Sequence, residues 1–344
     1  MMISIAQGGV RMRKGAANCI TDVAGVKVGH VTLHEKLNEE ETICTGVTAI
    51  LPHSGNLFMK KTPAASYVIN GYGKTCGLVQ VDELGVLESP IMLTNTFSVG
   101  DVLRGTMQYM LSENPEIGDR TSSLNIVVGE CNDSYLNSMR LMAVQPEHAI
   151  EAIKRADSAP VEEGAAGAGK GMMCFGYKGG IGTASRIVQV EDGTAWTVGI
   201  LVLSNFGKRE ESRFADWAGA NPETPDGSII IVLATDAPLY DRQLRRLAKR
   251  CTIGLGRTGS HVSHGSGDIV IAFSTAELQD HSSPSSTGQL TYIREDRPAM
   301  NGLFRAAAEA TEEAIFRSLL KAQATEGRLG RTAEKAPLAA SANK

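Results

Sequence analysis

The sequence NPETPDGSIIIVLATDAPL, residues 221–239, changes abruptly from polar to apolar. Its Pro-Asp-Gly at residues 225–227 favours a turn, because proline fixes φ and glycine accepts most backbone conformations. From Ser228 onward the chain is almost continuously apolar, which is typical of a short strand buried on both faces. The sequence therefore predicts an exposed turn that leads directly into a buried strand over residues 228–234.

A serine at the first position of a buried strand has a specific chemical use. Cleavage of the Gly227–Ser228 bond would leave Ser228 with a free α-amino group beside its own hydroxyl. An α-amine has an ordinary pKa of about 7.7–8.0, so part of it is neutral and able to accept a proton near pH 7. The same residues are also compatible with an ordinary turn before an ordinary strand, because Asp-Gly-Ser turns are common.

A long polar segment precedes this bond. Residues 207–225 read GKREESRFADWAGANPETP, and this charged, proline-bearing composition predicts an exposed loop. Such a loop would let a new C-terminus at Gly227 move away after cleavage. A plain surface insertion accounts for the same composition.

A second candidate segment, HGSGDIVIAFST, covers residues 264–275. Ser266 lies 38 residues after Ser228, and Asp268 follows two residues later. A nucleophilic serine needs a relay for its proton, and a carboxylate can hold the resulting ammonium in place. Ser266 and Asp268 could supply both if their loop packs beside the start of the Ser228 strand. Taken alone, a Gly-Ser-Gly-Asp loop is more often a simple turn.

Eight segments of the chain together carry a family resemblance. They are NCITDVAGVKVGH (18–30), TGVTAILPHSGNLF (45–58), LTNTFSVGDV (93–102), VVGECNDSYLN (127–137), GAAGAGKGMMCFGYKGGIGTASR (164–186), LVLSNFG (201–207), DGSIIIVLATDAPL (226–239) and HGSGDIVIAFST (264–275). In this order they resemble the DmpA-like L-aminopeptidase/D-esterase family, which includes the β-peptidyl aminopeptidases. The resemblance extends from about Asn18 to about Ala322, and eight ordered matches are far more specific than any one of them.

The resemblance implies an α/β (α+β) fold of the N-terminal-nucleophile-hydrolase type. This fold is a four-layer αββα sandwich of the kind found in DmpA and ornithine acetyltransferase. The resemblance also implies one inactive chain that cuts itself, giving an α-chain of residues 1–227 and a β-chain of residues 228–344 within one catalytic domain. The family's members are homotetramers of cleaved units, and they need no metal or organic cofactor.

The resemblance further implies roles for five residues. Ser228 is the nucleophile, and its freed α-amine is the general base. Ser266 and Asp268 assist that base, although some members carry Glu where this chain has Asp268. Asn205 and Tyr135, each near a predicted strand end, would donate hydrogen bonds to the oxyanion, where one donor contributes roughly 10²–10³ in rate. The implied substrates are short peptides, amides or esters that lose an N-terminal residue, including β-amino acyl and D-alanyl groups.

Hydrophobic patterning predicts a mixed α/β chain in which strands and helices do not alternate regularly. The predicted strands are residues 46–51, 66–70, 124–128, 185–190, 196–203, 228–234 and 268–273. The predicted helices are residues 99–111, 133–143, 146–156, 239–250 and 301–322, with Asp133 as the N-cap of the second and Pro146 opening the third. From Thr325 the sequence is polar and alanine-rich, which predicts a mobile tail over residues 325–344.

Composition narrows the classes of function. The 344 residues carry a net charge of −4 with a pI near 6.0, which argues against nucleic-acid or anionic-membrane partners. No apolar run approaches the roughly 18 residues of a membrane span, and no secretory signal is recognised, so a cytoplasmic enzyme is expected. Six scattered cysteines without CxxC spacing and seven histidines without HExxH pairing argue against a metal site.

The glycine-rich run offers a rival interpretation. Residues 164–170, GAAGAGK, nearly match the phosphate-binding GxxxxGK[ST] motif, and residues 229–236 resemble the strand with a terminal aspartate that accompanies it. However, Gly171 replaces the hydroxyl residue that binds Mg²⁺, no strand is predicted before Gly164, and later glycines disfavour the required helix. A nucleotide-binding protein and a non-catalytic homologue of the fold are therefore the alternatives to a self-processing hydrolase.

Overall fold

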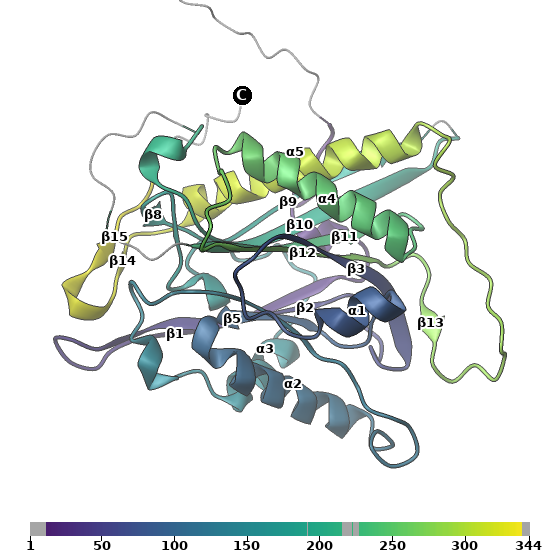
Figure 1. The fold of residues 1–344 in the computed structure, drawn as a ribbon, viewed down its shortest axis with the longest axis horizontal. Helices are drawn as coiled ribbons and strands as arrows, with labels where there is room; N and C mark the ends of the chain where they lie inside the picture. Colours follow the sequence, from purple (N-terminus) through teal and green to yellow (C-terminus); the bar gives the residue numbers. More distant parts are fainter. Residues whose placement is uncertain (1–11, 191, 215–221, 223–226, 339–344) are drawn as a thin grey trace, which may run out of the picture.

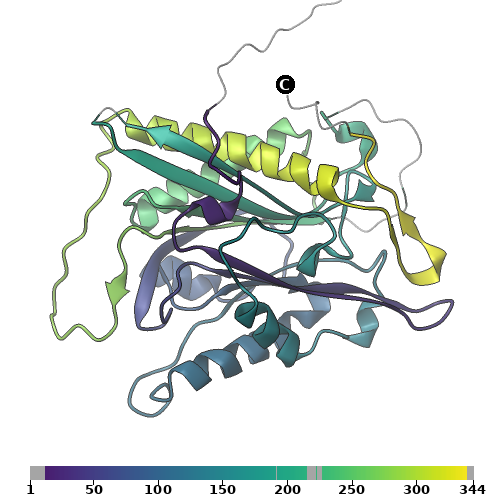
Figure 2. The same cartoon turned by 180° about the vertical axis from the view of Figure 1, so that it is seen from behind.

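The computed structural model describes residues 12–190, 192–214, 222 and 227–338. Two large β-sheets pack face to face, and helices cover the outer face of each sheet (Figures 1 and 2). A strand that is apolar on both faces requires a cover on both sides, and this arrangement supplies one. The predicted four-layer αββα sandwich is confirmed.

The larger sheet carries the strand that begins at Ser228. Its strand order is β13-β3-β12-β11-β10-β9, with β4 paired to β3. The central strand β11 (Ser228–Thr235) runs antiparallel to β10 (Ala195–Asn205) and parallel to β12 (Gly267–Ser274). The other strands are β3 (Lys60–Gly71), β4 (Val86–Leu87), β9 (Gly180–Gln189) and β13 (Gln279–Asp280). These directions bring the start of β11, the start of β12 and the end of β10 to one edge.

The smaller sheet has the order β1-β2-β5-β6. Its strands are β1 (Lys27–Lys36), β2 (Thr42–Leu51), β5 (Ile91–Asn95) and β6 (Val127–Cys131). Because β5 and β6 are parallel, both end at the same edge, where Asn95 pairs with Cys131. Two short hairpins lie outside these sheets: β7 (Met173–Cys174) with β8 (Tyr177–Lys178), and β14 (Thr325–Glu326) with β15 (Thr332–Ala333).

Helices form the two outer layers. In Figure 1, α4 (Asp241–Arg257) and α5 (Ala299–Lys321) lie over the larger sheet, while α2 (Val99–Glu113) and α3 (Pro146–Lys154) lie over the smaller one. The short α1 is Leu78–Leu84, and single 3₁₀ turns lie at Ile20–Asp22, Thr96–Ser98, Met139–Leu141, Gly167–Gly169, Arg209–Glu211 and Arg328–Gly330. Within the described ranges, no helix has the length and apolar character that crossing a membrane requires.

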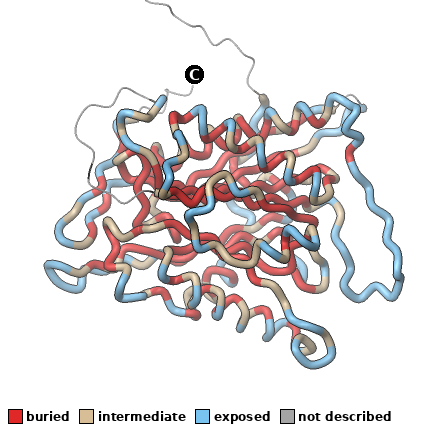
Figure 3. Tube along the Cα trace, in the orientation of Figure 1, coloured by how far each residue is buried: buried red, intermediate tan, exposed pale blue. Residues whose placement is uncertain are grey.

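Alternation along β11 explains how one strand supports two cores. Ile229, Ile231 and Leu233 belong to the cluster under α4 and α5, whereas Ile230 and Val232 belong to the cluster between the sheets. All are fully buried, and burial of each such side chain contributes about 1.5–3 kcal/mol. Figure 3 shows this burial through both sheets. The start of β11 is therefore held rigidly from both sides, which suits a strand that must present a reactive residue.

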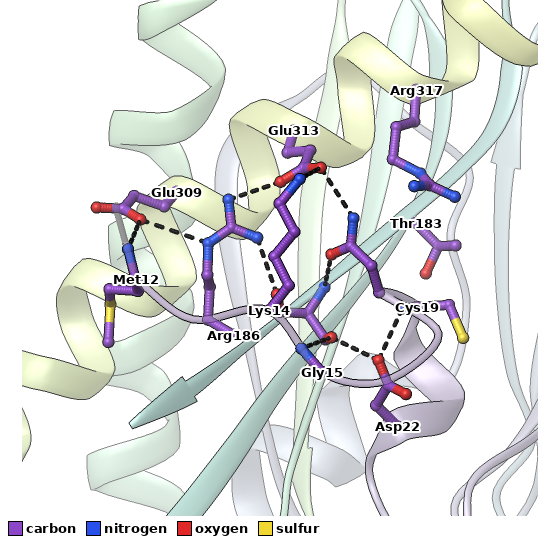
Figure 4. Close-up of polar contacts among 12 residues, drawn as sticks. Met12, Lys14, Gly15, Cys19, Asp22, Thr183, Arg186, Glu309, Glu313 and Arg317 are labelled. Atoms are coloured by element: carbon purple, nitrogen blue, oxygen red, sulfur yellow. Dashed lines mark hydrogen bonds and ion pairs between the residues drawn. The ribbon is translucent and has the colours of Figure 1, made fainter. Parts of the chain in front are cut away.

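A polar network centred on the buried Glu313 joins the N-terminal segment to α5 and β9 (Figure 4). The Glu313 carboxylate accepts hydrogen bonds from Lys14 Nζ at 2.6 Å, Arg186 Nη2 at 2.7 Å and Asn18 Nδ2 at 2.8 Å. Burial alone would raise the pKa of Glu313, but the Lys14 hydrogen bond and the Arg186 charge outweigh it and lower the pKa. Since Glu313 follows Ser228 in the chain and the other three residues precede it, this network would join the two fragments of a cleaved protein.

The predicted elements agree with the observed ones in most cases. Each predicted strand overlaps an observed strand, and four of the five predicted helices correspond to α2, α3, α4 and α5. The helix predicted over residues 133–143 is wrong, because only the 3₁₀ turn Met139–Leu141 forms there. Asp133 is not a helix cap but a buried residue whose Oδ1 accepts a hydrogen bond from Asn137 Nδ2 at 3.0 Å. The predictions do not include the longer strands β1 and β5, the short helix α1, or the two-residue strands β4, β7, β8, β13, β14 and β15.

The C-terminal region also differs from expectation. Residues 325–338, expected from composition to begin a mobile tail, contain the β14–β15 hairpin and bury Thr325, Ala333 and Ala336. The Arg328 N–H donates to the carbonyl oxygen of Leu136 at 2.8 Å, so this region packs on the turn after β6. Residues 339–344 lie outside the described residues, as does most of the polar loop predicted before Gly227.

Candidate active site

Ser228 and Asn205 face each other at the edge of the larger sheet. Asn205 is the last residue of β10 and Ser228 the first of β11, and the antiparallel register pairs them directly. Directly opposed residues of an antiparallel pair project their side chains from the same face. Both side chains are buried, with exposed fractions of 7% for Asn205 and 6% for Ser228. The register therefore places an amide donor beside the hydroxyl.

Glycine is the only residue type that fits at position 227, directly before Ser228, without displacing the backbone. A Cβ built on Gly227 would lie 1.8 Å from the Asn205 carbonyl oxygen and 2.7 Å from the Phe206 Cα. These contacts are far inside van der Waals distance, and they involve backbone atoms that cannot rotate away. The missing side chain lets the bond between Gly227 and Ser228 lie against the end of β10.

The loop before β12 reaches Ser228 through the parallel pairing of β11 and β12. Ile229 is the register partner of Asp268, so Gly267 lies next to Ser228. The Gly267 N–H donates a hydrogen bond to Ser228 Oγ at 3.1 Å. Ser266 Oγ donates to Asp268 Oδ1 at 2.7 Å, and both residues are buried. The structure thus brings the predicted pair Ser266 and Asp268 to the start of the Ser228 strand.

Asp268 is buried and has few hydrogen-bond donors around its carboxylate. Burial raises the pKa of Asp268 to about 6, although hydrogen bonds from Ser266 and from the Ile229 N–H act in the opposite direction. Among the described residues, Oδ2 has no hydrogen-bond partner. The Ile229 N–H that acts on this carboxylate belongs to the residue after Ser228, so Asp268 lies close to the start of β11.

The orientation of the Asn205 amide is determined by its neighbours. Its Oδ1 accepts the Met173 N–H at 2.9 Å, and its Nδ2 donates to the Asn132 carbonyl oxygen at 2.9 Å. A flipped amide would place like groups against each other, so only one orientation satisfies both contacts. One N–H of Nδ2 makes no hydrogen bond within the described residues, and this side chain lines a pocket, so the amide can donate to an oxygen there.

Tyr135 lies on the wall of the same pocket, which is also lined by Asn132, Met173, Asn205 and Gly227. The Arg331 guanidinium lies 4.9 Å from the Tyr135 ring centroid, which fixes the ring from the outside. The pocket volume is about 50 Å³, against the roughly 300–1,000 Å³ typical of ligand pockets. Tyr135 and Asn205 therefore line the same small cavity.

Glu130 was not singled out from the sequence. Its buried carboxylate accepts hydrogen bonds from the Lys74 N–H at 2.8 Å and from Thr96 Oγ1. A Cβ built on Gly73 would lie 3.5 Å from Glu130 Oε1 and 3.6 Å from the Gly267 Cα, so the carboxylate lies close to Gly267 at the start of β12. Its position near the end of β6, two residues before Asn132-Asp133, is the available signal, because active-site residues gather at strand ends.

Lys178 is a second residue that the sequence alone does not single out. It is fully buried in the glycine-rich region. A lysine within a buried β-hairpin gives no periodic signal that separates it from a surface lysine.

The structure does not favour the nucleotide-binding alternative. Residues 164–171 contain the 3₁₀ turn Gly167–Gly169 in place of the strand, loop and α-helix that cradle a phosphate. Gly164 instead forms a β-bridge with Ile181. His261 and His264 are exposed. In the described ranges, no group of three or more His, Cys, Asp or Glu side chains is arranged to hold a metal ion.

The fold and this edge of the sheet define a class, the N-terminal-nucleophile type of hydrolase. Comparison with known proteins gives the family: the model for peptidase family S58 matches residues 18–333. A β-peptidyl aminopeptidase, BapA of Sphingosinicella microcystinivorans, is 41% identical over 353 aligned residues, covering 94% of this chain and 87% of the relative. The chain therefore belongs to peptidase family S58, as the sequence resemblance predicted.

Two solved structures are similar over nearly their whole length. The PH0078 protein of Pyrococcus horikoshii OT3 is 49% identical with a TM-score of 0.88, covering 95% of this chain and 93% of that one. The second is the L-aminopeptidase D-Ala-esterase/amidase of Ochrobactrum anthropi, described as a prototype of the serine aminopeptidases with a variant Ntn hydrolase fold. It is 32% identical with a TM-score of 0.88, covering 95% of this chain and 93% of that one. The chain is accordingly a hydrolase of the serine aminopeptidase class.

Proposed function

We propose that this chain is a self-processing aminopeptidase in which Ser228 is the nucleophile first for its own cleavage and then for substrate. The observation that carries the proposal is the register of Ser228 with Asn205, together with the Gly267 N–H on Ser228 Oγ at 3.1 Å. One edge of the sheet thereby holds a hydroxyl, an amide donor and the buried carboxylate of Asp268. These are the parts that acyl transfer requires.

In the maturation step, Ser228 Oγ attacks the carbonyl carbon of Gly227. The C–N bond then breaks, and the proton lost by Oγ ends on the Ser228 nitrogen. The product is an ester between the Gly227 carbonyl and Ser228 Oγ. Water cleaves this ester, which releases the Gly227 carboxylate and leaves Ser228 with a free hydroxyl and a free α-amine. The fragments are residues 1–227 and residues 228–344.

In turnover, the neutral α-amine of Ser228 accepts the Oγ proton while Oγ attacks the substrate carbonyl. The free N–H of Asn205 and the phenol of Tyr135 donate to the oxyanion. The ammonium then gives its proton to the leaving group, and water hydrolyses the acyl-enzyme with the amine again as base. Asp268 stabilises the ammonium, and Ser266 holds the carboxylate in place through its hydrogen bond to Oδ1.

The substrate is a short peptide, amide or ester with a free N-terminal amine. Such an amine is cationic at neutral pH and needs an acidic partner. The Glu130 carboxylate is suited to that role, because it lies close to Gly267, whose N–H contacts Ser228 Oγ. Similarity to a β-peptidyl aminopeptidase supports β-amino acyl groups as substrates, and similarity to a D-Ala-esterase supports D-alanyl groups. We further expect a cytoplasmic enzyme that assembles as a homotetramer of cleaved units and needs no cofactor.

The proposal is tested with chromogenic amides of β-alanine, L-alanine and D-alanine, each assayed against its N-acetylated counterpart. We expect cleavage of at least one free-amine amide and none of the acetylated amides. Ser228→Ala should abolish activity, and Glu130→Gln should raise KM for the free-amine substrate. Equal cleavage of acetylated and free substrates, or an active Ser228→Ala protein, would contradict the assignment.

A further inference from the structure

Lys178 is a fully buried cation at which three carbonyl groups converge. Its Nζ donates to the carbonyl oxygens of Gly169 at 2.8 Å, Met172 at 2.7 Å and Gly179 at 2.8 Å. Three acceptors at these distances need three N–H groups, which only the protonated amine has. Among the described residues, none of these hydrogen bonds goes to a carboxylate. Keeping a buried charge without an ion-pair partner is costly, so its role requires an explanation.

The groups around Lys178 come from four elements or their flanking turns. Burial lowers the pKa of Lys178 to about 7. Cys44 of β2 acts to raise that pKa, Lys170 lowers it further, and Asp133 after β6 and Cys174 of β7 raise it. Asp133 is itself buried, with its pKa raised to about 7 mainly by burial. Lys178 is thus solvated chiefly by backbone carbonyls, and their positions depend on it.

One of these carbonyls connects Lys178 to the proposed active site. The Met172 carbonyl that accepts from Nζ belongs to the same peptide group as the Met173 N–H, which donates to Asn205 Oδ1 at 2.9 Å. A single peptide unit and a single side-chain amide therefore separate the ammonium from the free N–H of Asn205. Hydrogen bonds arranged in such a chain polarise one another, so a cation at one end strengthens the donor at the other.

We propose that Lys178 is a positioning residue of the active site, whose ammonium fixes and polarises the Met172–Met173 peptide and, through it, the Asn205 amide that donates to the oxyanion. This inference rests on the proposed function, since it needs Asn205 as an oxyanion donor. Loss of the Lys178 charge would weaken the donor without removing it. The expected loss in kcat is about tenfold, smaller than the roughly 10²–10³ expected when a donor is deleted.

The test is a double-mutant cycle on the full-length protein with Lys178→Met and Asn205→Ala. Rates are expressed per cleaved chain, counted from the amount of free Ser228 N-terminus. If Lys178 acts through Asn205, Lys178→Met lowers kcat about tenfold with KM nearly unchanged. In the Asn205→Ala background, the same substitution should lower kcat by no more than a further factor of about two. Lys170→Met is the matched control, because it removes a half-buried lysine of the same segment; it should leave kcat unchanged.

Two results would overturn the inference in different ways. If the fold-loss in kcat of the double variant equals the product of the two single-variant losses, Lys178 acts independently of Asn205. An Asn205→Ala enzyme with unchanged kcat would remove Asn205 as a donor, which refutes that part of the proposed function and the inference with it. Retention of kcat in Lys178→Arg but not in Lys178→Met would support the need for a cation.

A second measurement avoids dependence on turnover or cleavage. In the uncut Ser228→Ala protein, the chemical shifts of the Met173 N–H and of the Asn205 side-chain amide report the strength of the hydrogen-bond chain. Lys178→Met should move both proton resonances upfield, and Lys170→Met should not. Unchanged shifts in a folded Lys178→Met protein would overturn the inference.

Discussion

Asp268→Asn should reveal how strongly the fold disfavours a charged carboxylate at this position. The carboxyl has an ordinary pKa of 3.8 and a pKa of about 6 in the folded chain, raised by burial. Because the folded state binds the proton more tightly, it loses stability as pH rises through this window. At about 1.36 kcal/mol per pKa unit, the full penalty above pH 6 is about 3 kcal/mol. An asparagine never ionises and escapes this penalty.

The assay compares free energies of unfolding in urea for Ser228→Ala and Ser228→Ala/Asp268→Asn, so that both chains stay uncut. The advantage of the asparagine variant should grow by about 2 kcal/mol between pH 4.5 and pH 7.5. An asparagine N–H at the Oδ2 position would be unpaired, at a cost of about 1–3 kcal/mol that does not vary with pH. This cost cancels when the difference in unfolding free energy at one pH is subtracted from that at the other.

Asp280→Asn provides a control of opposite sign. A hydrogen bond from Lys60 lowers the pKa of Asp280, so the wild type should gain stability relative to this variant as pH rises. The gain should be small because both side chains are largely exposed. If the difference in unfolding free energy between Asp268 and asparagine stays constant with pH, the folded state accepts the charge at Asp268 without a penalty, contrary to this prediction.

Other predictions address the cut, the linkage of the fragments and the rival function. Gly227→Ala should slow self-cleavage by about 10²-fold or more, because its Cβ would overlap the Asn205 carbonyl oxygen; Gly100→Ala, where nothing lies within 4 Å, should cleave normally on a denaturing gel. Glu313→Gln should lower the unfolding free energy by about 3 kcal/mol in urea melts, because Arg186 loses a buried partner; an unchanged midpoint would contradict this. Millimolar Mg-ATP should leave the melting temperature unchanged, whereas a shift that disappears in Lys170→Ala would revive nucleotide binding.

The pattern around Ser228 shows what sequence can predict. A continuous apolar run specifies a strand with two buried faces, so β11 and its start at Ser228 followed from local chemistry. The rest of the candidate site came from motif resemblance rather than from periodicity. The sequence alone does not show that Ser266 and Asp268 lie near Ser228. Their proximity depends on the parallel pairing of β11 with β12, which only the structure shows.

The features that the sequence does not predict correctly depend on tertiary contacts. The helix expected after Asp133 does not form, because burial and the Asn137 hydrogen bond hold Asp133 inside the protein. Strand β1 is buried at one end and exposed at the other, so its sequence lacks a clear two-residue period. The orientation of Asn205 depends on Met173, 32 residues away, and no local pattern encodes that contact.

Self-cleavage at Gly227–Ser228 is measured by the intact mass of the purified protein combined with sequencing of its N-termini. We expect fragments of 227 and 117 residues (344 − 227), with the second beginning Ser-Ile-Ile-Ile. By proportion of the 36.5 kDa chain, the smaller fragment should weigh about 12 kDa (117/344 of the total). Ser228→Ala should give one species of full mass. A wild-type protein that keeps its full mass and still hydrolyses free-amine substrates would contradict the account, because Ser228 would then have no α-amine to act as its base.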